Sequence, residues 1–117
     1  AHCDAPLLVD SPSPQARLEA VRHFCGSEVM SRLIYNSIDE HCTEEELAAL
    51  RECGVKSAVL LALSNRAVRP VDRLTLLRDG LLPAAERAGI KNILVDTGVL
   101  DIPSVGWAAE AIRLVKE

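Results

Sequence analysis

The chain of 117 residues has few aromatic residues, no basic cluster and no long apolar run. Lys and Arg number 13 against 17 Asp and Glu, for a net charge of -4, and the basic residues are scattered. Because nucleic-acid binding depends on clustered Lys and Arg, we expect no nucleic-acid partner. No apolar run approaches the roughly 20 residues that cross a bilayer, and no basic start precedes an apolar block. We therefore expect a soluble, cytoplasmic protein without a membrane span or signal peptide.

The sequence also lacks the closely spaced cysteines and histidines that hold structural metals. Its cysteines and histidines are Cys3, Cys25, Cys42, Cys53, His2, His23 and His41. They form no Cys-x-x-Cys pair and are dispersed, so we expect no metal bound directly to the chain. We interpret the cysteines as reduced, because free cysteine packs well as a small hydrophobic residue.

The apolar content is almost entirely aliphatic. Hydrophobic residues make up 49% of the chain and charged residues 26%, a balance typical of globular proteins. Phe24, Tyr35 and Trp107 are each single in the sequence. The core must therefore consist of Leu, Val, Ile and Ala, which usually fill the space between helices and a sheet.

Four short apolar runs alternate with four helical patterns. The runs are residues 6–9, 32–35, 58–63 and 92–95, and their composition suits strands covered on both faces. The helical patterns begin at Ser13-Pro14, at the capping box of Thr43 and Glu46, near Val71 and at Ile102-Pro103. Gly80 and Pro83 are expected to split the third helix. The last helix is expected to turn one set of residues to the core: Val105, Ala108, Ala109, Ile112 and Val115.

The first polar residues after the strands lie at positions 10, 36, 64 and 96, separated by 26, 28 and 32 residues. This is the length of a strand-loop-helix-loop unit, so the chain is an α/β protein of consecutive βα units. Such units favour parallel strands with right-handed crossovers. The architecture is either an open doubly wound sheet or half of a (β/α)8 barrel, and neither composition nor period decides between them.

The polar residues at the strand ends are the candidates for function, because ligands of parallel α/β proteins bind at the carboxyl ends of strands. They include Asp10, Asn36, Asn65 and Asp96. Asp accepts paired N–H bonds and Asn both donates and accepts, which suits a flat heterocycle with alternating N–H and carbonyl groups. The alternative interpretation is that these residues merely form turns or helix caps.

Several segments resemble the pterin-binding methyltransferase barrels, in particular the H subunit of tetrahydromethanopterin S-methyltransferase and bacterial relatives that use tetrahydrofolate. The resemblance begins with LLVDS at 7–11, LIYNSI at 33–38 and LLALSN at 60–65. It continues in the same order with GLL at 80–82, AGI at 88–90, LVDT at 94–97 and DIPSVG at 101–106. It covers essentially the whole chain from Pro6 onward.

The resemblance implies that residues 1–117 form strands three to six of a (β/α)8 TIM barrel, half of a pterin-binding domain. Asp10 and Asp96 would then bind N–H groups of the pterin ring, and Asn36 would lie near the nitrogen that carries the methyl group. Asn65 would be a further contact, although the family often has Ala-Phe-Asn where this chain has Leu63-Ser64-Asn65.

The implied reaction is methyl transfer between a corrinoid on a partner protein and N5 of a reduced pterin, either tetrahydrofolate or tetrahydromethanopterin. Asn36 would be the catalytic residue, because it can form a hydrogen bond at N5 in the transition state. A half barrel would expose aliphatic side chains on its concave face, such as Leu8, Ile34, Leu60 and Leu94 or their neighbours, and unpaired edge strands. We therefore expect it to form a homo-oligomer or to associate with the other half of the barrel.

Two other interpretations belong to different classes of protein. The first is a non-catalytic βα-repeat module, binding or structural, in which the strand-end Asp residues act as caps. The second is a domain like a response regulator, which shares the repeat but has an acidic pair after its first strand that this chain lacks.

Overall fold

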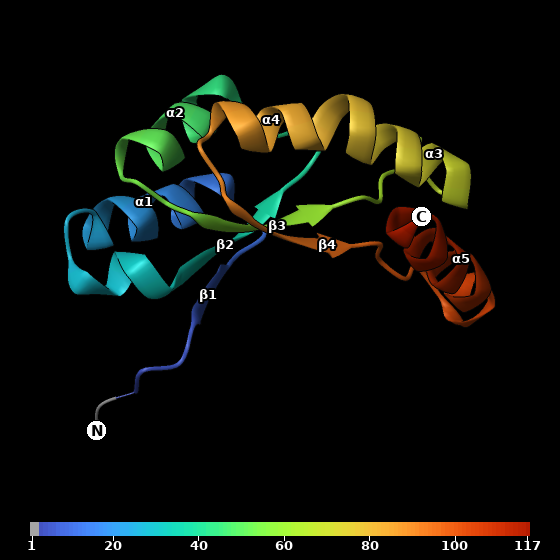
Figure 1. Cartoon of the computed structure of the whole chain (residues 1–117), viewed down its shortest axis with the longest axis horizontal. Coiled ribbons are helices and arrows are strands. Elements are labelled where there is room, and N and C mark those ends of the chain that lie inside the picture. Colours follow the sequence, from blue (N-terminus) through green and yellow to red (C-terminus); the bar gives the residue numbers. More distant parts are fainter. Residues whose placement is uncertain (1–2) are drawn as a thin grey trace.

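The computed structural model describes residues 3–117 as consecutive βα units built on one sheet (Figure 1). The strands are β1 (Leu7–Asp10), β2 (Leu33–Ile38), β3 (Ser57–Leu61) and β4 (Asn92–Asp96). Their order in the sheet is β1-β2-β3-β4, and each neighbouring pair is parallel. His2, one of the dispersed histidines, lies outside the described residues.

The helices begin at the expected signals. They are α1 (Pro14–Phe24), the short η1 (Glu28–Arg32), α2 (Glu44–Glu52), α3 (Pro70–Leu76), η2 (Leu77–Leu81), α4 (Leu82–Arg87), η3 (Ile102–Ser104) and α5 (Val105–Lys116). Ser13 Oγ accepts the Ala16 N–H at 3.3 Å and caps α1. At α2 the capping box is complete: Thr43 Oγ1 accepts the Glu46 N–H at 3.2 Å, and Glu46 Oε2 accepts the Thr43 N–H at 2.9 Å.

The third helical pattern is divided, but its pieces follow one another without a loop. Between α3 and α4 lies η2, a π-helical turn that contains Gly80. Pro83 is the second residue of α4, directly after this turn, and its missing N–H and its ring interrupt the regular hydrogen-bond pattern at that point. The predicted interruption is therefore a local widening of the helix, and Figure 1 shows the three segments running on along the sheet.

The sheet topology decides between the two architectures left open by the sequence. A doubly wound sheet reverses its strand order and carries helices on both faces. Here the strand order is sequential, and α1, α2, α3 and α4 lie over the same face (Figure 1). No described helix lies over the opposite face, which we call the bare face. This arrangement is consistent with part of a (β/α)8 barrel.

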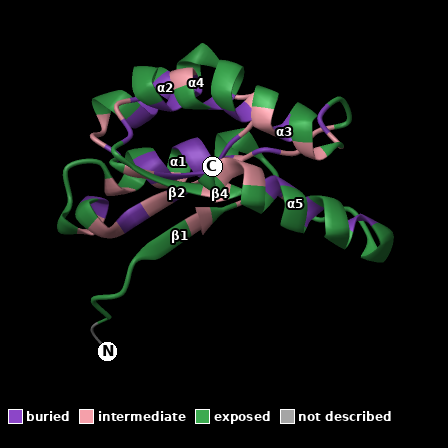
Figure 2. Ribbon diagram, turned by 45° about the vertical axis from the view of Figure 1, so that its right-hand side comes forward, coloured by how far each residue is buried: buried purple, intermediate pink, exposed green. Residues whose placement is uncertain are grey.

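The core lies between the sheet and the helices over it, and it is aliphatic as expected (Figure 2). Its fully buried side chains include Val21, Leu33, Ile38, Leu50, Val55, Leu60, Leu81 and Ala88. Leu60, expected among the aliphatic residues of the concave face, thus points to the helices, and its neighbours Val59 and Leu61 lie on the bare face.

The expected core face of α5 is wrong in part. Ala108 is buried as expected, and Val115 is half-buried against the core. Ala109 is exposed, Val105 is 51% exposed and Ile112 is 49% exposed, while Ala111, which was not expected on this face, is buried. The reason is that α5 packs against α3 beyond the carboxyl end of β4 (Figure 1), so a narrow stripe of alanines is covered.

The interpretation of all cysteines as reduced is also wrong. Cys25 and Cys53 form a disulfide, while Cys3 and Cys42 are free. Cys25 follows α1 and Cys53 follows α2, and these two helices pack side by side over the sheet. Their ends meet with a Cα–Cα distance of 5.0 Å, a proximity that 28 residues of sequence separation do not reveal.

Candidate functional site

Three of the four candidate residues project from the bare face of the sheet. Successive side chains of a strand point to opposite faces. Val9, Tyr35 and Val95 pack into the core under the helices. Their successors Asp10, Asn36 and Asp96 therefore lie on the bare face. Asp10 and Asp96 are the last residues of β1 and β4, whereas Asn36, expected just after its strand, lies within β2, two residues before its end.

The register of the strands places these three residues relative to one another. Asp10 pairs with Asn36 on neighbouring strands. Asn36 pairs with Val59, and Asp96 pairs with Leu61. With neighbouring strands about 4.8 Å apart, Asn36 lies between the two carboxylates, beside Asp10 and two strands away from Asp96. The Asn36–Ser37 peptide bond is cis, and the register of β2 and β3 shifts between Asn36 and Ile38.

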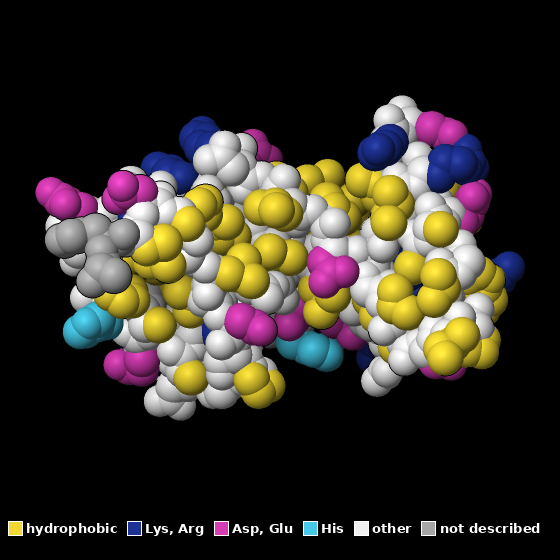
Figure 3. All heavy atoms as spheres, turned by 90° about the horizontal axis from the view of Figure 1, so that it is seen from below, with side chains coloured by type: hydrophobic (Ala, Val, Ile, Leu, Met, Phe, Trp, Pro, Cys, Tyr) yellow, Lys and Arg dark blue, Asp and Glu magenta, His cyan; other side chains and the backbone are white. Residues whose placement is uncertain are grey.

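The surface beside these polar residues is apolar. Leu8 is 54% exposed and Leu94 is 49% exposed, while Ile34 and Leu61 are half-buried. Figure 3 shows this side of the molecule, with hydrophobic side chains spread over it, isolated carboxylates among them and most Lys and Arg at the edges. An apolar floor with Asp and Asn at one edge can hold the flat face of a heterocycle while its polar edge is hydrogen-bonded.

The carboxylate of Asp96 is held by its own turn. Asp96 Oδ1 accepts the Gly98 N–H at 2.7 Å, and the following Thr97 is buried. Gly98 adopts φ +64°, and a Cβ at this position would overlap the side chain of Leu63. Only glycine fits this left-handed position without strain.

Asn65 lies apart from the other three candidates. It is exposed in the loop after β3, and it shares a shallow pocket with Glu40, His41 and Arg66. Its neighbour Ser64 accepts the Ala67 N–H through Oγ at 3.1 Å and forms the local turn. The structure thus groups Asn65 with the loop that follows β2.

The sequence patterns gave no sign of a buried polar network directly beneath Asn36. Arg17, Tyr35 and Glu46 come from α1, β2 and α2, and all three are buried. Arg17 donates through Nε to Tyr35 Oη at 3.1 Å and through Nη2 to Glu46 Oε1 at 3.3 Å. The Tyr35 hydroxyl donates to the same Glu46 oxygen at 2.7 Å. The network joins the first two βα units behind the strand ends.

This network changes the acidity of its members. Burial disfavours the Glu46 carboxylate, but hydrogen bonds from the Thr43 backbone and Tyr35, with the Arg17 charge, outweigh it and hold the pKa of Glu46 below its usual value. Burial raises the pKa of the Tyr35 phenol far above its ordinary range. Burial, with the nearby charges of Glu46 and Asp39, also raises the pKa of the Cys42 thiol to about 12, so Cys42 is no ready nucleophile at neutral pH.

A second buried arginine, Arg73, binds the backbone after β4, at the other edge of the sheet. Arg73 is 1% exposed in α3. Its Nε donates to the Val68 carbonyl at 2.8 Å, and its Nη1 donates to the Thr97 carbonyl at 2.8 Å. One sequence signal could have identified both arginines: each lies three residues after the proline that starts its helix, Pro14 or Pro70.

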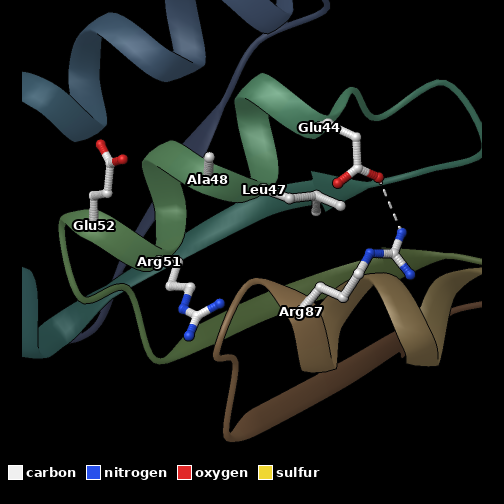
Figure 4. A pocket seen from close by; sticks show the side chains of 6 residues that line it. All are labelled: Glu44, Leu47, Ala48, Arg51, Glu52 and Arg87. Atoms are coloured by element: carbon white, nitrogen blue, oxygen red, sulfur yellow. Dashed lines mark hydrogen bonds and ion pairs between the residues drawn. The ribbon is translucent and has the colours of Figure 1, made fainter.

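A surface groove lies elsewhere, between α2 and α4. It encloses about 590 Å³, and its lining residues are Glu44, Leu47, Ala48, Arg51, Glu52 and Arg87. Figure 4 shows Glu44 and Arg87 reaching toward each other across the groove, where they form an exposed ion pair of 3.3 Å. None of the candidate residues lines it, so the groove belongs to the outer helical layer.

Within residues 3–117, no group of three His, Cys, Asp or Glu side chains could hold a metal ion. Nor does this part of the chain contain a helix that is both long enough and apolar enough to cross a membrane.

Fold and site together define a parallel α/β protein that carries Asp and Asn at the carboxyl ends of its strands. The chain belongs to the family described as "Tetrahydromethanopterin S-methyltransferase MtrH subunit", whose model matches residues 2–117. This finding confirms the family resemblance inferred from the strand-end segments.

The relatives of the chain include three proteins named as the H subunit of tetrahydromethanopterin S-methyltransferase. The protein from Methanopyrus kandleri is 29% identical over 119 residues, covering 95% of this chain and 37% of the relative. The Methanococcus maripaludis protein is 32% identical over 117 residues, covering 94% and 36%. The Methanocaldococcus jannaschii protein is 30% identical over 113 residues, covering 91% and 35%. The chain thus spans little more than a third of the length of these relatives.

Proposed function

We propose that this chain is part of a methyltransferase that binds a reduced pterin and transfers a methyl group between N5 of the pterin and a corrinoid on a partner protein. The observation that carries the proposal is the placement of Asp10, Asn36 and Asp96 together on the bare face. Membership of the family supports a methyltransferase that acts with tetrahydromethanopterin. Tetrahydrofolate is the other pterin that the site chemistry suits.

In this proposal the two carboxylates orient the ring. Asp10 and Asp96 accept hydrogen bonds from N–H groups of the pterin, and the floor of Leu8, Ile34 and Leu94 contacts its flat face. Asp96 Oδ1 already accepts the Gly98 N–H, which leaves Oδ2 and further lone pairs of the carboxylate for the ligand. Asn65, in the neighbouring loop, is the outermost contact.

Asn36 is the proposed catalytic residue. When the methyl group leaves N5, the electron pair of the N–C bond stays on nitrogen. The corrinoid, held by the partner protein, would supply the nucleophile that accepts the methyl group. An amine nitrogen is a poor leaving group unless a proton or a strong hydrogen bond offsets its developing charge. The Asn36 side-chain amide can donate that bond, with water as the proton carrier.

The sheet in this proposal forms strands three to six of a (β/α)8 barrel, with residues 1–117 as half of the pterin domain. The sequential strand order, the single helical layer and the apolar bare face support that assignment. The partners are the corrinoid protein and a chain segment or second copy that covers the bare face. The cobalt resides on the corrinoid, and the chain itself needs no metal for this role.

The experiment is Asp96→Ala in the complete protein, with tetrahydromethanopterin and tetrahydrofolate as titrants in a calorimeter. Removing a charged hydrogen-bond acceptor typically costs about 1.5 to 3 kcal/mol, which is roughly a ten- to hundredfold loss of affinity. Asp79→Ala, an exposed carboxylate on η2, is the matched control and should bind as the wild type does. Unchanged affinity of Asp96→Ala would overturn the assignment, and absence of pterin binding by the wild type would favour a non-catalytic module.

A further inference from the structure

Two buried arginines occupy the same position within α1 and α3, the helices of the first and third βα units. Arg17 follows Pro14 in α1, and Arg73 follows Pro70 in α3, both at a spacing of three residues. Proline at the start of a helix fixes where the helix begins. The arginine one turn later therefore has the same place in its helix, but the two side chains reach different strands. Arg17 reaches the residue after β1, the strand of its own unit, whereas Arg73 reaches the residues after β4, the strand that follows its helix. The two arginines are 5% and 1% exposed as whole residues.

Arg17 holds the backbone directly after Asp10. Its Nη1 donates to the Ser11 carbonyl at 2.6 Å, while Nε donates to Tyr35 Oη at 3.1 Å. Ser11 follows Asp10, and Tyr35 precedes Asn36. One guanidinium group thus connects the residues adjoining two candidate ligands on neighbouring strands, and Glu46 provides its counter-charge.

Arg73 holds the backbone directly after Asp96. Its Nη1 donates to the Thr97 carbonyl at 2.8 Å and to the Gly98 carbonyl at 3.2 Å. Gly98 in turn donates its N–H to Asp96 Oδ1 at 2.7 Å. Nε of Arg73 donates to the Val68 carbonyl at 2.8 Å, which ties the loop after β3 to the end of β4.

Arginine is suited to this task and lysine is not. The planar guanidinium group presents its donors in a fixed fork, so several carbonyl oxygens must adopt set positions around it. A buried cation also requires hydrogen-bond partners, which makes displacement of those carbonyls costly. Lysine keeps the charge but offers one flexible ammonium group, which cannot join three separate segments in the same way.

We propose that Arg17 and Arg73 are positioning residues, Arg17 for the carboxylate of Asp10 and Arg73 for the carboxylate of Asp96. Each acts through the backbone of the residue that follows its Asp, and neither touches the ligand. This inference rests on the proposed pterin site. Neither family membership nor a catalytic role for Asn36 explains why these two arginines are buried, and the inference gives them a role.

The test is a crossed set of double-mutant cycles in the complete protein, with binding of tetrahydromethanopterin and tetrahydrofolate measured by titration calorimetry. The single variants are Arg17→Lys, Arg73→Lys, Asp10→Asn and Asp96→Asn, and the four Arg–Asp combinations complete the cycles. Asn retains one acceptor oxygen, so residual binding stays measurable. A cycle reports coupling between two positions, whereas a general loss of stability affects every background equally.

We expect each Arg→Lys change to weaken binding about tenfold in the wild-type background. In the background of its own Asp→Asn partner, the same change should cost less than about twofold, because the positioned carboxylate is already gone. In the exchanged pairs the losses of binding free energy should be additive. These pairs are Arg17→Lys with Asp96→Asn and Arg73→Lys with Asp10→Asn. Additive effects in all four combinations would overturn the inference and leave the pterin site intact.

Failure of the proposed function is distinguishable from failure of this inference. If the wild-type protein binds neither pterin, both the proposed function and the positioning role are refuted. Circular dichroism shows whether each lysine variant folds. If Arg17→Lys does not fold, Tyr35→Phe takes its place in the cycles, because it removes one acceptor of Arg17. If Arg73→Lys does not fold, Arg73→Gln takes its place, because it leaves a shorter, neutral donor. Strong coupling to the matched Asp alone is the result that supports the assignment.

Discussion

The buried ion pair of Arg17 and Glu46 can be tested by a single change of charge, Glu46→Gln. Glu46 is 1% exposed, and its carboxylate accepts hydrogen bonds from Arg17, Tyr35 and the Thr43 backbone. Glutamine has the same shape, but only one of its two terminal atoms accepts hydrogen bonds. The variant therefore leaves the guanidinium group buried without its counter-charge, and it places an N–H donor where one of the other donors now binds.

The expected loss of stability in Glu46→Gln follows from the surroundings of Arg17. Breaking a buried pair by removing one partner typically costs about 3 to 5 kcal/mol in the free energy of unfolding. Arg17 keeps its bonds to the Ser11 carbonyl and to Tyr35 Oη in the variant. We therefore expect a loss near the lower limit, about 3 kcal/mol. Urea unfolding of the purified protein should show a lower midpoint at an unchanged slope.

The matched control is Glu45→Gln, the same change one residue earlier in the same helical turn. The Glu45 side chain is 74% exposed and pairs with Arg22 at 3.2 Å on the surface. Exposed pairs contribute little, so we expect a loss below about 1 kcal/mol. Both variants remove one negative charge from the first turn of α2, so the effect of the helix dipole is shared.

The pH dependence gives the same test a second readout. The folded-state pKa of Glu46 lies below its usual value, so its contribution is fully present above the unfolded pKa, about 4.3. That contribution is lost as pH falls through the lower, folded pKa. Glu46→Gln should therefore lose less stability than the wild type between neutral pH and this acid range. Equal stability of the Glu46 and Glu45 variants, together with identical acid profiles, would refute the role assigned to the pair.

Three further outcomes are expected. Asn36→Ala should lower turnover of the complete enzyme more than it weakens pterin binding, since its hydrogen bond to N5 strengthens in the transition state; a raised KM with normal turnover would make Asn36 a binding residue only. Gly98→Ala should destabilise the protein by more than about 1 kcal/mol in thermal unfolding, because alanine is strained at positive φ. Gly26→Ala, also at positive φ but with nothing within 4 Å of its Cβ, should cost less, and equal losses would show that overlap with Leu63 is unimportant. The isolated 117-residue polypeptide should associate through its bare face, where Leu8 and Leu94 are about half exposed; sedimentation as a stable monomer that binds pterin would contradict this.

Local signals in the sequence predicted much of the fold. The proline at position 14 and the capping box of Thr43 and Glu46 mark helix starts that the structure confirms, because capping depends on residues within one turn. The apolar runs located all four strands for the same reason. The positions of Asp10, Asn36 and Asp96 at strand ends followed from these boundaries. Their roles toward a pterin remain a prediction.

Contacts between distant units could not be predicted in this way. The disulfide of Cys25 and Cys53 and the network of Arg17, Tyr35 and Glu46 join residues from different βα units. The exposed side of α5 was likewise mistaken, because its apolar pattern alone does not reveal that α3 is its neighbour. In each case the deciding quantity is the distance between two helices or strands in space.

The sequence by itself therefore determined the repeat of βα units, the helix starts and the polar residues at or near the ends of β1, β2 and β4, since these depend on neighbours within a few residues. The tertiary structure decided that the strands keep sequential order under a single helical layer, and that Asp10, Asn36 and Asp96 share one face. It also decided which buried arginines hold the loops beside them. These features arise when helices and strands pack, because only packing brings Ser11 to Arg17 and Thr97 to Arg73.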